Sequence, residues 1–165
     1  MRDNYFNLLS QVKFDIEYYK LFYQRYTTIE RRLNMAFAIV STGSLAGFCI
    51  SEEAKIVYAV ILIITQVASA VRPYFPFANR AKELDRLLIK MEYLFIEIEN
   101  RWSDINQGKL DEEQVQSIIK VFKERRQKLQ MEHLPDDMLP NNKKITKKAD
   151  KNANDYLGLN YGATI

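Results

Sequence analysis

Cysteine and histidine are almost absent from this chain, which contains Cys49 and His133 and no other residue of either type. A single cysteine excludes an intrachain disulfide scaffold, and a single histidine excludes a metal site built from several histidines. The chain also lacks the phosphate-binding patterns G-x-x-x-x-G-K-[ST] and G-x-G-x-x-G and the metal-binding patterns H-E-x-x-H and C-x-x-C. We therefore expect no enzyme activity and no cofactor.

Glycine and proline are scarce, with five and four residues among 165, so few positions force a helix to end. Charge of one sign is not in excess either, because 24 basic and 21 acidic side chains leave a net charge of +3. Residues 111–165 hold ten basic and nine acidic side chains, without a recognisable nucleic-acid-binding motif. The sequence thus gives no reason to expect a duplex nucleic acid as partner.

Two long uncharged runs stand out against this background: 33–51, with nineteen residues, and 56–71, with sixteen. As helices they would be about 28 Å and about 24 Å long, close to the ~30 Å hydrocarbon core of a bilayer. The alternative is a buried hairpin in a soluble core, but residues 56–64 (IVYAVILII) have no polar stripe and the rest of the chain is too small to cover both helices. We predict a transmembrane hairpin with the loop 52–55.

The basic residues orient this hairpin. The loop has Lys55 as its one basic residue, whereas several basic residues flank the two outer ends of the hairpin. The positive-inside rule then places both termini in the cytoplasm and the loop outside, in a multi-pass membrane protein. The flanking basic residues are Arg25, Arg31, Arg32, Arg72, Arg80, Lys82 and Arg86.

Both flanking segments, 1–32 and 72–131, carry helical patterns, so the predicted fold is all-α. Apolar residues spaced alternately by three and four form a seam on each segment, typical of helices that pack together or join protomers. The first seam continues without a break into the run at 33–51, which predicts one long helix. The seams are Leu9, Val12, Ile16, Tyr19, Tyr23 and Tyr26, and Leu84, Leu88, Met91, Phe95, Ile98, Trp102 and Ile105.

Residues beyond the second seam are predicted to form one more helix and a tail. Gly108 should end the preceding helix, and Asp111, Glu112 and Glu113 should open the next at the end where the helix dipole favours negative charge. His133 is expected in a loop before Pro135. Residues 132–165 are expected to form a Lys-rich tail whose polar first part is flexible.

Polar and small residues within the apolar runs are the candidate functional groups. Gly43 and Gly47 form G-x-x-x-G, which allows close helix packing, either inside the hairpin or between protomers. A polar residue such as Gln66 is costly in hydrocarbon, so it either bonds to Asn34 or Ser41 within one protomer or lines a polar pore. The pore-lining candidates are Thr65, Gln66, Ser69 and Arg72, then Asn34, Ser41 and Ser44.

The overall layout resembles a known family. A charged N-terminal helix ends in IERRLN (Ile29 to Asn34), a Gly- and Ser-rich first span and a short hairpin follow, and a long helix returns as RAKELDRLLIKMEYLFIEIENRW (Arg80 to Trp102). Over roughly residues 10–160 this is similar to the SLATT family of bacterial two-transmembrane effectors.

The resemblance implies a pore-forming or membrane-disrupting effector of antiphage defence, which oligomerises and breaches the inner membrane in abortive infection. It also implies control by a nucleotide second messenger or by a separate nucleotidyltransferase or sensor protein. The alternative is a membrane-anchored scaffold whose cytoplasmic coiled coil recruits a partner.

Overall fold

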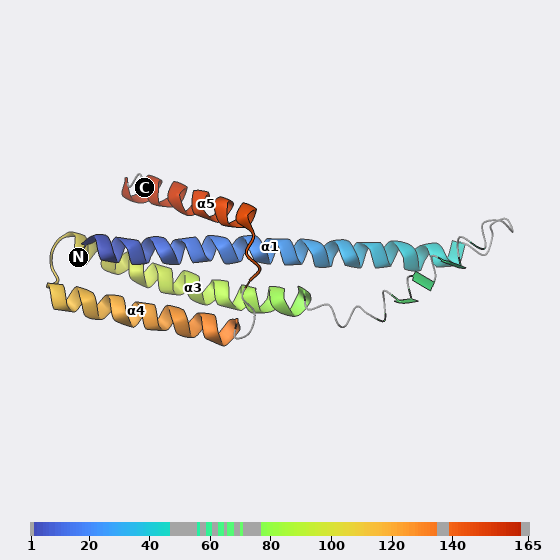
Figure 1. Ribbon diagram of the computed structural model, residues 1–165, viewed down its shortest axis with the longest axis horizontal. Coiled ribbons are helices and arrows are strands. Elements are labelled where there is room, and N and C mark those ends of the chain that lie inside the picture. Colours follow the sequence, from blue (N-terminus) through green and yellow to red (C-terminus); the bar gives the residue numbers. More distant parts are fainter. Residues whose placement is uncertain are drawn as a thin grey trace. The chain divides into compact units, whose positions relative to one another are not determined.

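The computed structural model describes residues 2–46, 56, 59–60, 63–64, 66–67, 70, 77–134 and 139–162. Within these ranges the long elements are α1 (Arg2–Ala46), α3 (Phe77–Asn106), α4 (Glu112–His133) and α5 (Lys143–Tyr161), shown in Figure 1. The separate positions described between 56 and 70 are helical as well, and no described residue belongs to a strand. The all-α fold expected from the sequence is confirmed for this part of the chain.

The chain divides into two compact units. The first, which we call the bundle unit, comprises Met1–Tyr23 and Lys82–Ile165, and the second, the apolar unit, comprises Gln24–Ala81 and contains both uncharged runs. Helix α1 belongs to both units, since it begins in the bundle unit and continues unbroken to Ala46. The prediction of one helix that runs from the N-terminal segment into the first apolar run is therefore confirmed.

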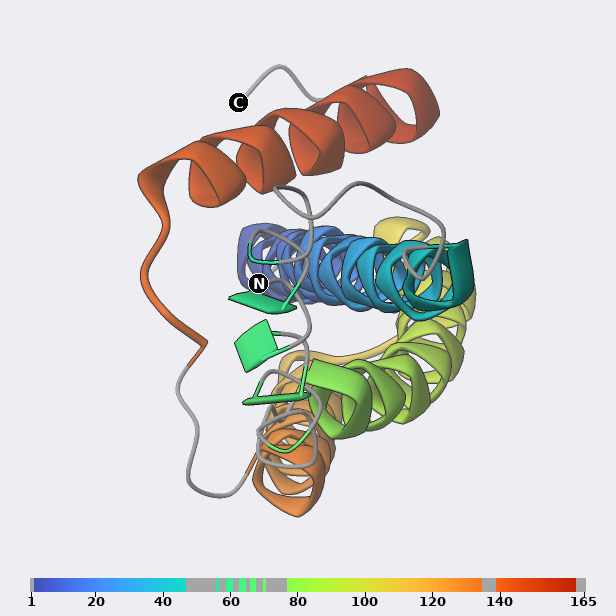
Figure 2. The ribbon, with the colours of Figure 1, turned by 90° about the vertical axis from the view of Figure 1, so that its right-hand side faces the viewer.

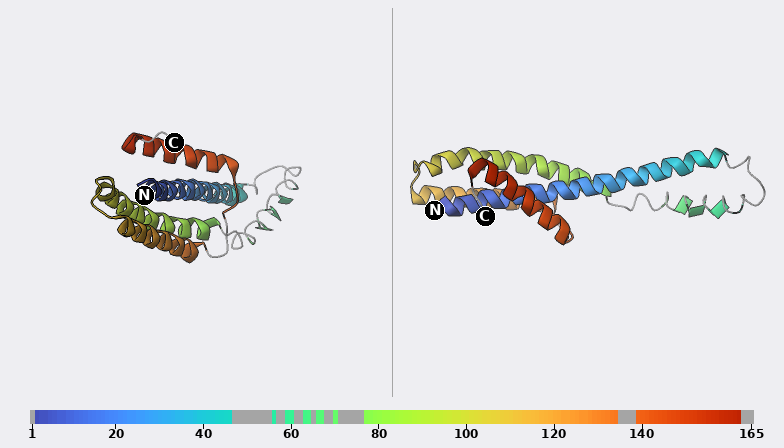
Figure 3. Two further views of the ribbon diagram at one scale, coloured as in Figure 1. Left: turned by 60° about the vertical axis from the view of Figure 1, so that its left-hand side comes forward. Right: turned by 90° about the horizontal axis from the view of Figure 1, so that it is seen from above.

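Within the bundle unit, α5 lies on one side of α1 while α3 and α4 lie on the other (Figures 1 and 2). Seen from above, α5 crosses α1 obliquely (Figure 3). The hydroxyl of Tyr5 donates a 2.9 Å hydrogen bond to the carbonyl oxygen of Ile98, which fixes the start of α1 against α3 across 93 positions of sequence. The predicted packing of the two segments that flank the apolar runs is confirmed by this contact.

The core of the bundle unit follows the predicted seams, with Tyr23 and Trp102 as half-buried exceptions. Phe22 is fully buried beside Tyr23, because a straight helix of 3.6 residues per turn drifts away from a strict seven-residue repeat. The buried apolar side chains of α1 and α3 in this unit are Tyr5, Leu8, Leu9, Val12, Ile16, Tyr19, Phe22, Leu84, Leu87, Leu88, Met91, Leu94, Phe95, Ile98 and Ile105.

Helix α4 starts as the sequence predicts. Gly108 has φ +69°, a left-handed conformation that glycine adopts without strain, and it ends the turn after α3. The Asp111 carboxylate accepts a 2.8 Å hydrogen bond from the Gln114 backbone, while the Gln114 side chain accepts one from the Asp111 backbone. This capping box satisfies two backbone donors at the start of α4.

The expectation of a flexible Lys-rich tail is wrong, because residues 143–161 form helix α5. Asn142 caps its start and Gly162 ends it with φ +64°. Ala149, Ala153 and Leu157, spaced by four, are buried and form a narrow apolar stripe on a helix whose other positions are mostly polar. Low mean hydropathy hid this stripe, although lysine and alanine are good helix formers.

In the apolar unit, α1 packs beside the start of α3. The rings of Tyr26 and Phe77 have centroids 5.9 Å apart, and Tyr26 and Ala81 are buried. None of the helices in the described residues is at once long enough and apolar enough to cross a bilayer. Residues 47–55 and half of residues 56–71 lie outside the described residues, and with them the predicted loop of the hairpin.

We predict that Leu157→Ala lowers the free energy of unfolding by about 2–5 kcal/mol, because it removes a fully buried side chain from the stripe that docks α5. Leu159→Ala is the matched control, since Leu159 is 88% exposed and its loss should change stability by less than about 0.5 kcal/mol. Denaturant titration of the full chain in detergent, followed by Trp102 fluorescence, measures both, because the Trp102 and Tyr161 ring centroids are 6.1 Å apart. Equal effects of the two variants would contradict the docking of α5.

Candidate functional site

The structure describes the predicted pore-lining and packing residues unevenly. Gln66 is helical and exposed, and Asn34 is half-buried on α1. The backbone of Ser41, Gly43 and Ser44 belongs to α1, but their side chains lie outside the described part. The structure therefore neither brings this set together nor separates it; the predicted members wholly outside the described residues are Gly47, Thr65, Ser69 and Arg72.

Large apolar side chains of the apolar unit are exposed. Their exposed fractions run from 50% for Val60 to 73% for Ile56, whereas the core leucines of the bundle unit are almost fully buried. Contiguous exposed apolar surface in a folded chain marks contact with a partner or a membrane. These side chains, drawn from both uncharged runs, are Met35, Ile39, Ile56, Val60, Ile63, Ile64 and Val67.

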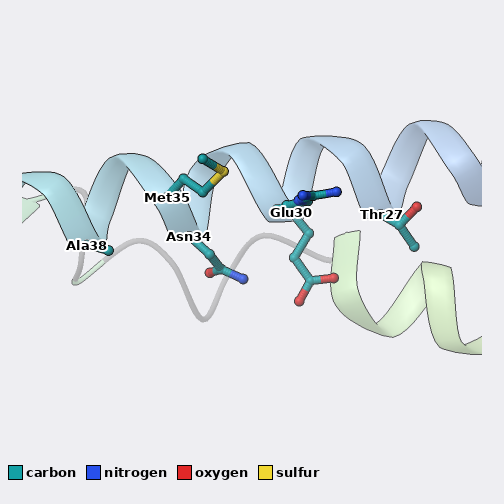
Figure 4. Close-up of a pocket in the computed structure, with 6 residues that line it drawn as sticks. Thr27, Glu30, Asn34, Met35 and Ala38 are labelled. Atoms are coloured by element: carbon teal, nitrogen blue, oxygen red, sulfur yellow. The ribbon is translucent and has the colours of Figure 1, made fainter.

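A recess of about 390 Å³ lies on α1 at the beginning of the first apolar run. Figure 4 shows the side chains of Glu30 and Asn34 pointing to the same side of the helix. All the lining residues come from one helix, so the recess is open and does not enclose a ligand as a small-molecule pocket does. It marks the stretch where polar side chains give way to apolar ones; its lining is Thr27, Glu30, Arg31, Asn34, Met35 and Ala38.

A partly buried polar network joins α1 to α4 in the bundle unit. The Asp15 carboxylate, almost fully buried, accepts a 2.6 Å hydrogen bond from the Arg126 Nε and a 3.0 Å hydrogen bond from the Gln130 side chain. Gln130 also donates to the Tyr19 hydroxyl at 2.8 Å, and Arg126 donates to the Gln11 amide oxygen at 3.0 Å. We call these five residues the α1–α4 network.

Burial sets the electrostatics of this network. Loss of water around Asp15 raises the pKa of its carboxyl, and the hydrogen bond and charge of Arg126 together with Gln130 oppose that rise. Burial and the neighbouring Asp15 charge raise the pKa of Tyr19 to about 12. Loss of Arg126 while α1 and α4 stay packed would leave an uncompensated charge on the buried Asp15 carboxylate.

A second set of polar contacts joins α3 to α4. His133 is the last residue of α4 and is buried, so its expected place in a loop is wrong. Its Nδ1 lies 2.9 Å from the Glu83 carboxylate, and hydrogen bonding to His133 is the main cause that lowers the pKa of Glu83. Lys90 pairs with Glu132 at 2.8 Å. Helix α4 therefore includes His133, which the sequence analysis placed in the loop after it.

Helix α5 is held by one carboxylate of α3 and by α1. Glu99 accepts hydrogen bonds from the hydroxyls of Tyr156 at 2.7 Å and Tyr161 at 2.6 Å. Burial, and then the bond to Glu99, raise the pKa of Tyr156 to about 12 and that of Tyr161 further in the same direction. The Lys13 ammonium of α1 lies 4.0 Å from the Tyr156 ring centroid, a cation–π contact.

Sequence reasoning missed the α1–α4 network. Asp15 borders the α1 seam one position before Ile16, and the apolar spacing that defines the seam gives it no role. Gln11, Asp15 and Tyr19 recur at intervals of four, which places a polar row along the edge of the buried face. That periodicity was the available signal, but nothing in it identifies Arg126 as the partner.

No protein-family model, no curated protein and no solved structure matches this chain.

We predict that Arg126→Ala lowers the free energy of unfolding by about 2 kcal/mol or more, because it leaves the buried Asp15 carboxylate without its cation. Arg125→Ala is the matched control one position earlier, since Arg125 pairs with Glu97 where both side chains are about half exposed. Such a pair should contribute less than about 1 kcal/mol. Denaturant titrations of the two variants give both values, and a larger loss for Arg125→Ala would contradict the importance of the network.

The Arg126→Ala variant also allows a prediction of how stability depends on pH. A carboxyl whose pKa is higher in the folded than in the unfolded state destabilises the fold when ionised, so protonation restores stability as pH falls. Without Arg126 the pKa of Asp15 should rise further, because burial then acts against Gln130 alone. The stability deficit of Arg126→Ala relative to wild type should therefore shrink between pH 7 and about pH 4. A deficit that stays constant over this range would show that Asp15 is not the group left unpaired.

Proposed function

We propose that this chain is an oligomeric membrane effector, in which the two uncharged runs form a transmembrane hairpin that opens a pore and the bundle unit controls the opening. The observation that carries the proposal is the exposed apolar surface of the apolar unit, which contrasts with the fully buried core of the bundle unit. Uncharged runs of nineteen and sixteen residues supply that surface. Lipid is a solvent in which such side chains are stable without a protein cover.

Control by the bundle unit is supported by the continuity of α1. One helix carries both Asp15, which is tied to α4, and Met35 and Ile39, which are exposed in the apolar run. A signal that shifts α4 or α5 against α1 changes contacts of the same rigid element that enters the membrane. Coupling of this kind needs a shared element with two arrangements, and α1 is that element in our proposal.

Similarity to the SLATT family gives the proposal its biological setting. A bacterial antiphage effector of this kind resides in the inner membrane with both termini in the cytoplasm and arrests or kills the infected cell. Its trigger would be a nucleotide second messenger or a separate nucleotidyltransferase or sensor protein. The basic residues that flank the hairpin support the same orientation.

A membrane-anchored scaffold is the second candidate, and one observation favours it. Ile89, Tyr93 and Ile96 follow each other at intervals of four and three on α3 and are each more than half exposed. This stripe offers the bundle unit an apolar surface for another chain. If a second copy of this protein binds that surface, the effector is supported. If a different protein binds it, the scaffold is supported.

We predict that a cysteine introduced at Glu53, in a Cys49→Ser background, reacts with a membrane-impermeant thiol reagent added to intact cells. The residue lies in the loop that the positive-inside rule places outside. Asp150→Cys, in exposed α5, should react only after the cells are permeabilised. Labelling of Asp150→Cys but not Glu53→Cys in intact cells would reverse the orientation, and labelling of neither after permeabilisation would invalidate the assay.

We predict that Gln66→Leu abolishes toxicity and conductance while the protein still fractionates with membranes, because it removes the deepest polar side chain of the proposed pore face. Arg72→Glu should shift the pore toward cations, since it reverses a charge at the proposed cytoplasmic mouth. Reversal potentials in planar bilayers measure that shift, and Ile61→Leu is the control that should leave both properties unchanged. If neither Gln66→Leu nor Arg72→Glu has an effect, the pore face is wrongly assigned, and Asn34, Ser41 and Ser44 become the next face to test.

A further inference from the structure

Helix α5 presents five lysines on the side opposite its buried stripe. At about 100° per residue, four of these positions fall on the face of the helix turned away from Ala149, Ala153 and Leu157, and Lys143 lies at the edge of that face. All five are exposed. We call this group the lysine face: Lys143, Lys144, Lys147, Lys148 and Lys151.

The lysine face concentrates charge that the chain does not neutralise. Residues 143–151 hold five lysines and one aspartate, a net charge of +4 in a chain whose total is +3. Among the described residues, none of the five lysines takes part in an ion pair. Lys143 and Lys144 also lie in the first turn of α5, where the helix dipole disfavours positive charge. An external anion would reduce both the repulsion among the lysines and their unfavourable interaction with the helix dipole.

Contacts within the bundle unit set the direction of this face along α1. Tyr161 packs against Phe6, Tyr156 against Lys13, and Asn152 donates to Glu17 at 3.2 Å. Residues late in α5 therefore contact residues early in α1, so the two helices run antiparallel. The lysines, which precede Asn152, lie toward the end of the bundle unit from which α1 continues into the first apolar run.

We infer that the lysine face binds the anionic headgroups of the membrane leaflet into which the hairpin inserts, an inference that rests on the proposed membrane location. Polybasic segments close to an anionic leaflet gain about five-fold in attachment for each lysine. Lysine is a compact point charge suited to a diffuse surface of headgroup phosphates, whereas specific phosphate recognition favours the arginine fork. The lysine face contains no arginine and no aromatic side chain, which single-stranded nucleic acids need for stacking.

Energy transfer to labelled lipid tests this inference on the full chain. A donor fluorophore on Asn141→Cys, an exposed site two residues before Lys143, is introduced in a Cys49→Ser background. The protein is reconstituted into phosphatidylcholine vesicles with or without 30% phosphatidylglycerol, each with a headgroup-labelled acceptor. We expect transfer at least two-fold higher in the anionic vesicles, and a loss of that gain in about 0.5 M salt, where the Debye length falls to about 4 Å.

Two variants separate the lysine face from general charge. Replacement of all five lysines by glutamine should abolish the gain in transfer, while K120Q/K123Q/K128Q, which removes three exposed lysines of α4, should preserve it. Equal transfer in the two vesicle types, or an unchanged gain in the five-glutamine variant, overturns the inference. Tight binding of an RNA homopolymer through the lysine face, without any response to lipid, also overturns it.

Vesicle flotation distinguishes failure of the inference from failure of the proposed function. A chain that does not float with pure phosphatidylcholine vesicles lacks the membrane hairpin. In that case flotation with anionic vesicles that requires the five lysines still supports the lysine face, and no flotation with either vesicle refutes it.

Discussion

Apolar side chains that the chain does not cover are the constraint on which the rest of the structure depends. The core leucines that α1 and α3 contribute to the bundle unit are buried, whereas Ile39, Ile56 and Ile63 of the apolar unit remain largely exposed. Each fully buried side chain of this size gains about 1.5–3 kcal/mol over an exposed one, so several together provide a strong drive toward a lipid or protein cover. Both runs lack charged residues, and in our proposal lipid is the cover that fits their length and composition.

In our proposal, polar contacts make the bundle unit the part of the chain that responds to a signal. Besides the apolar side chains that each helix buries, α1 is held to α4 by the contact of Asp15 with Arg126, and α5 is held to α3 by Glu99. Contacts of this kind depend on geometry and charge more than apolar cores do, so a bound anion or a partner can alter them. Since α1 continues into the apolar unit, such a change reaches the proposed hairpin through one helix.

The long, strongly periodic elements could be predicted from sequence, and the features that depend on a single partner could not. The apolar seams predicted α1 and α3, and Asp111 predicted the start of α4, because each of these signals is a local sequence pattern. Helix α5 was missed since Ala149, Ala153 and Leu157 form too narrow a stripe to outweigh its polar composition. The Asp15–Arg126 bond joins residues 111 positions apart, and no local pattern encodes such a pairing. The pore-lining set stays a prediction, because most of it lies outside the described residues.

Release of trapped dye from sealed liposomes tests the central claim most directly. Purified full-length protein is reconstituted into liposomes that hold both a small anionic dye and a large labelled dextran, and candidate nucleotides are added in turn. A pore made of membrane hairpins predicts release of the small dye while the dextran is retained, with a rate that rises steeply with the protein-to-lipid ratio. Protein that inserts into the bilayer yet releases neither marker, with or without nucleotides, would contradict a pore and favour the membrane-anchored scaffold.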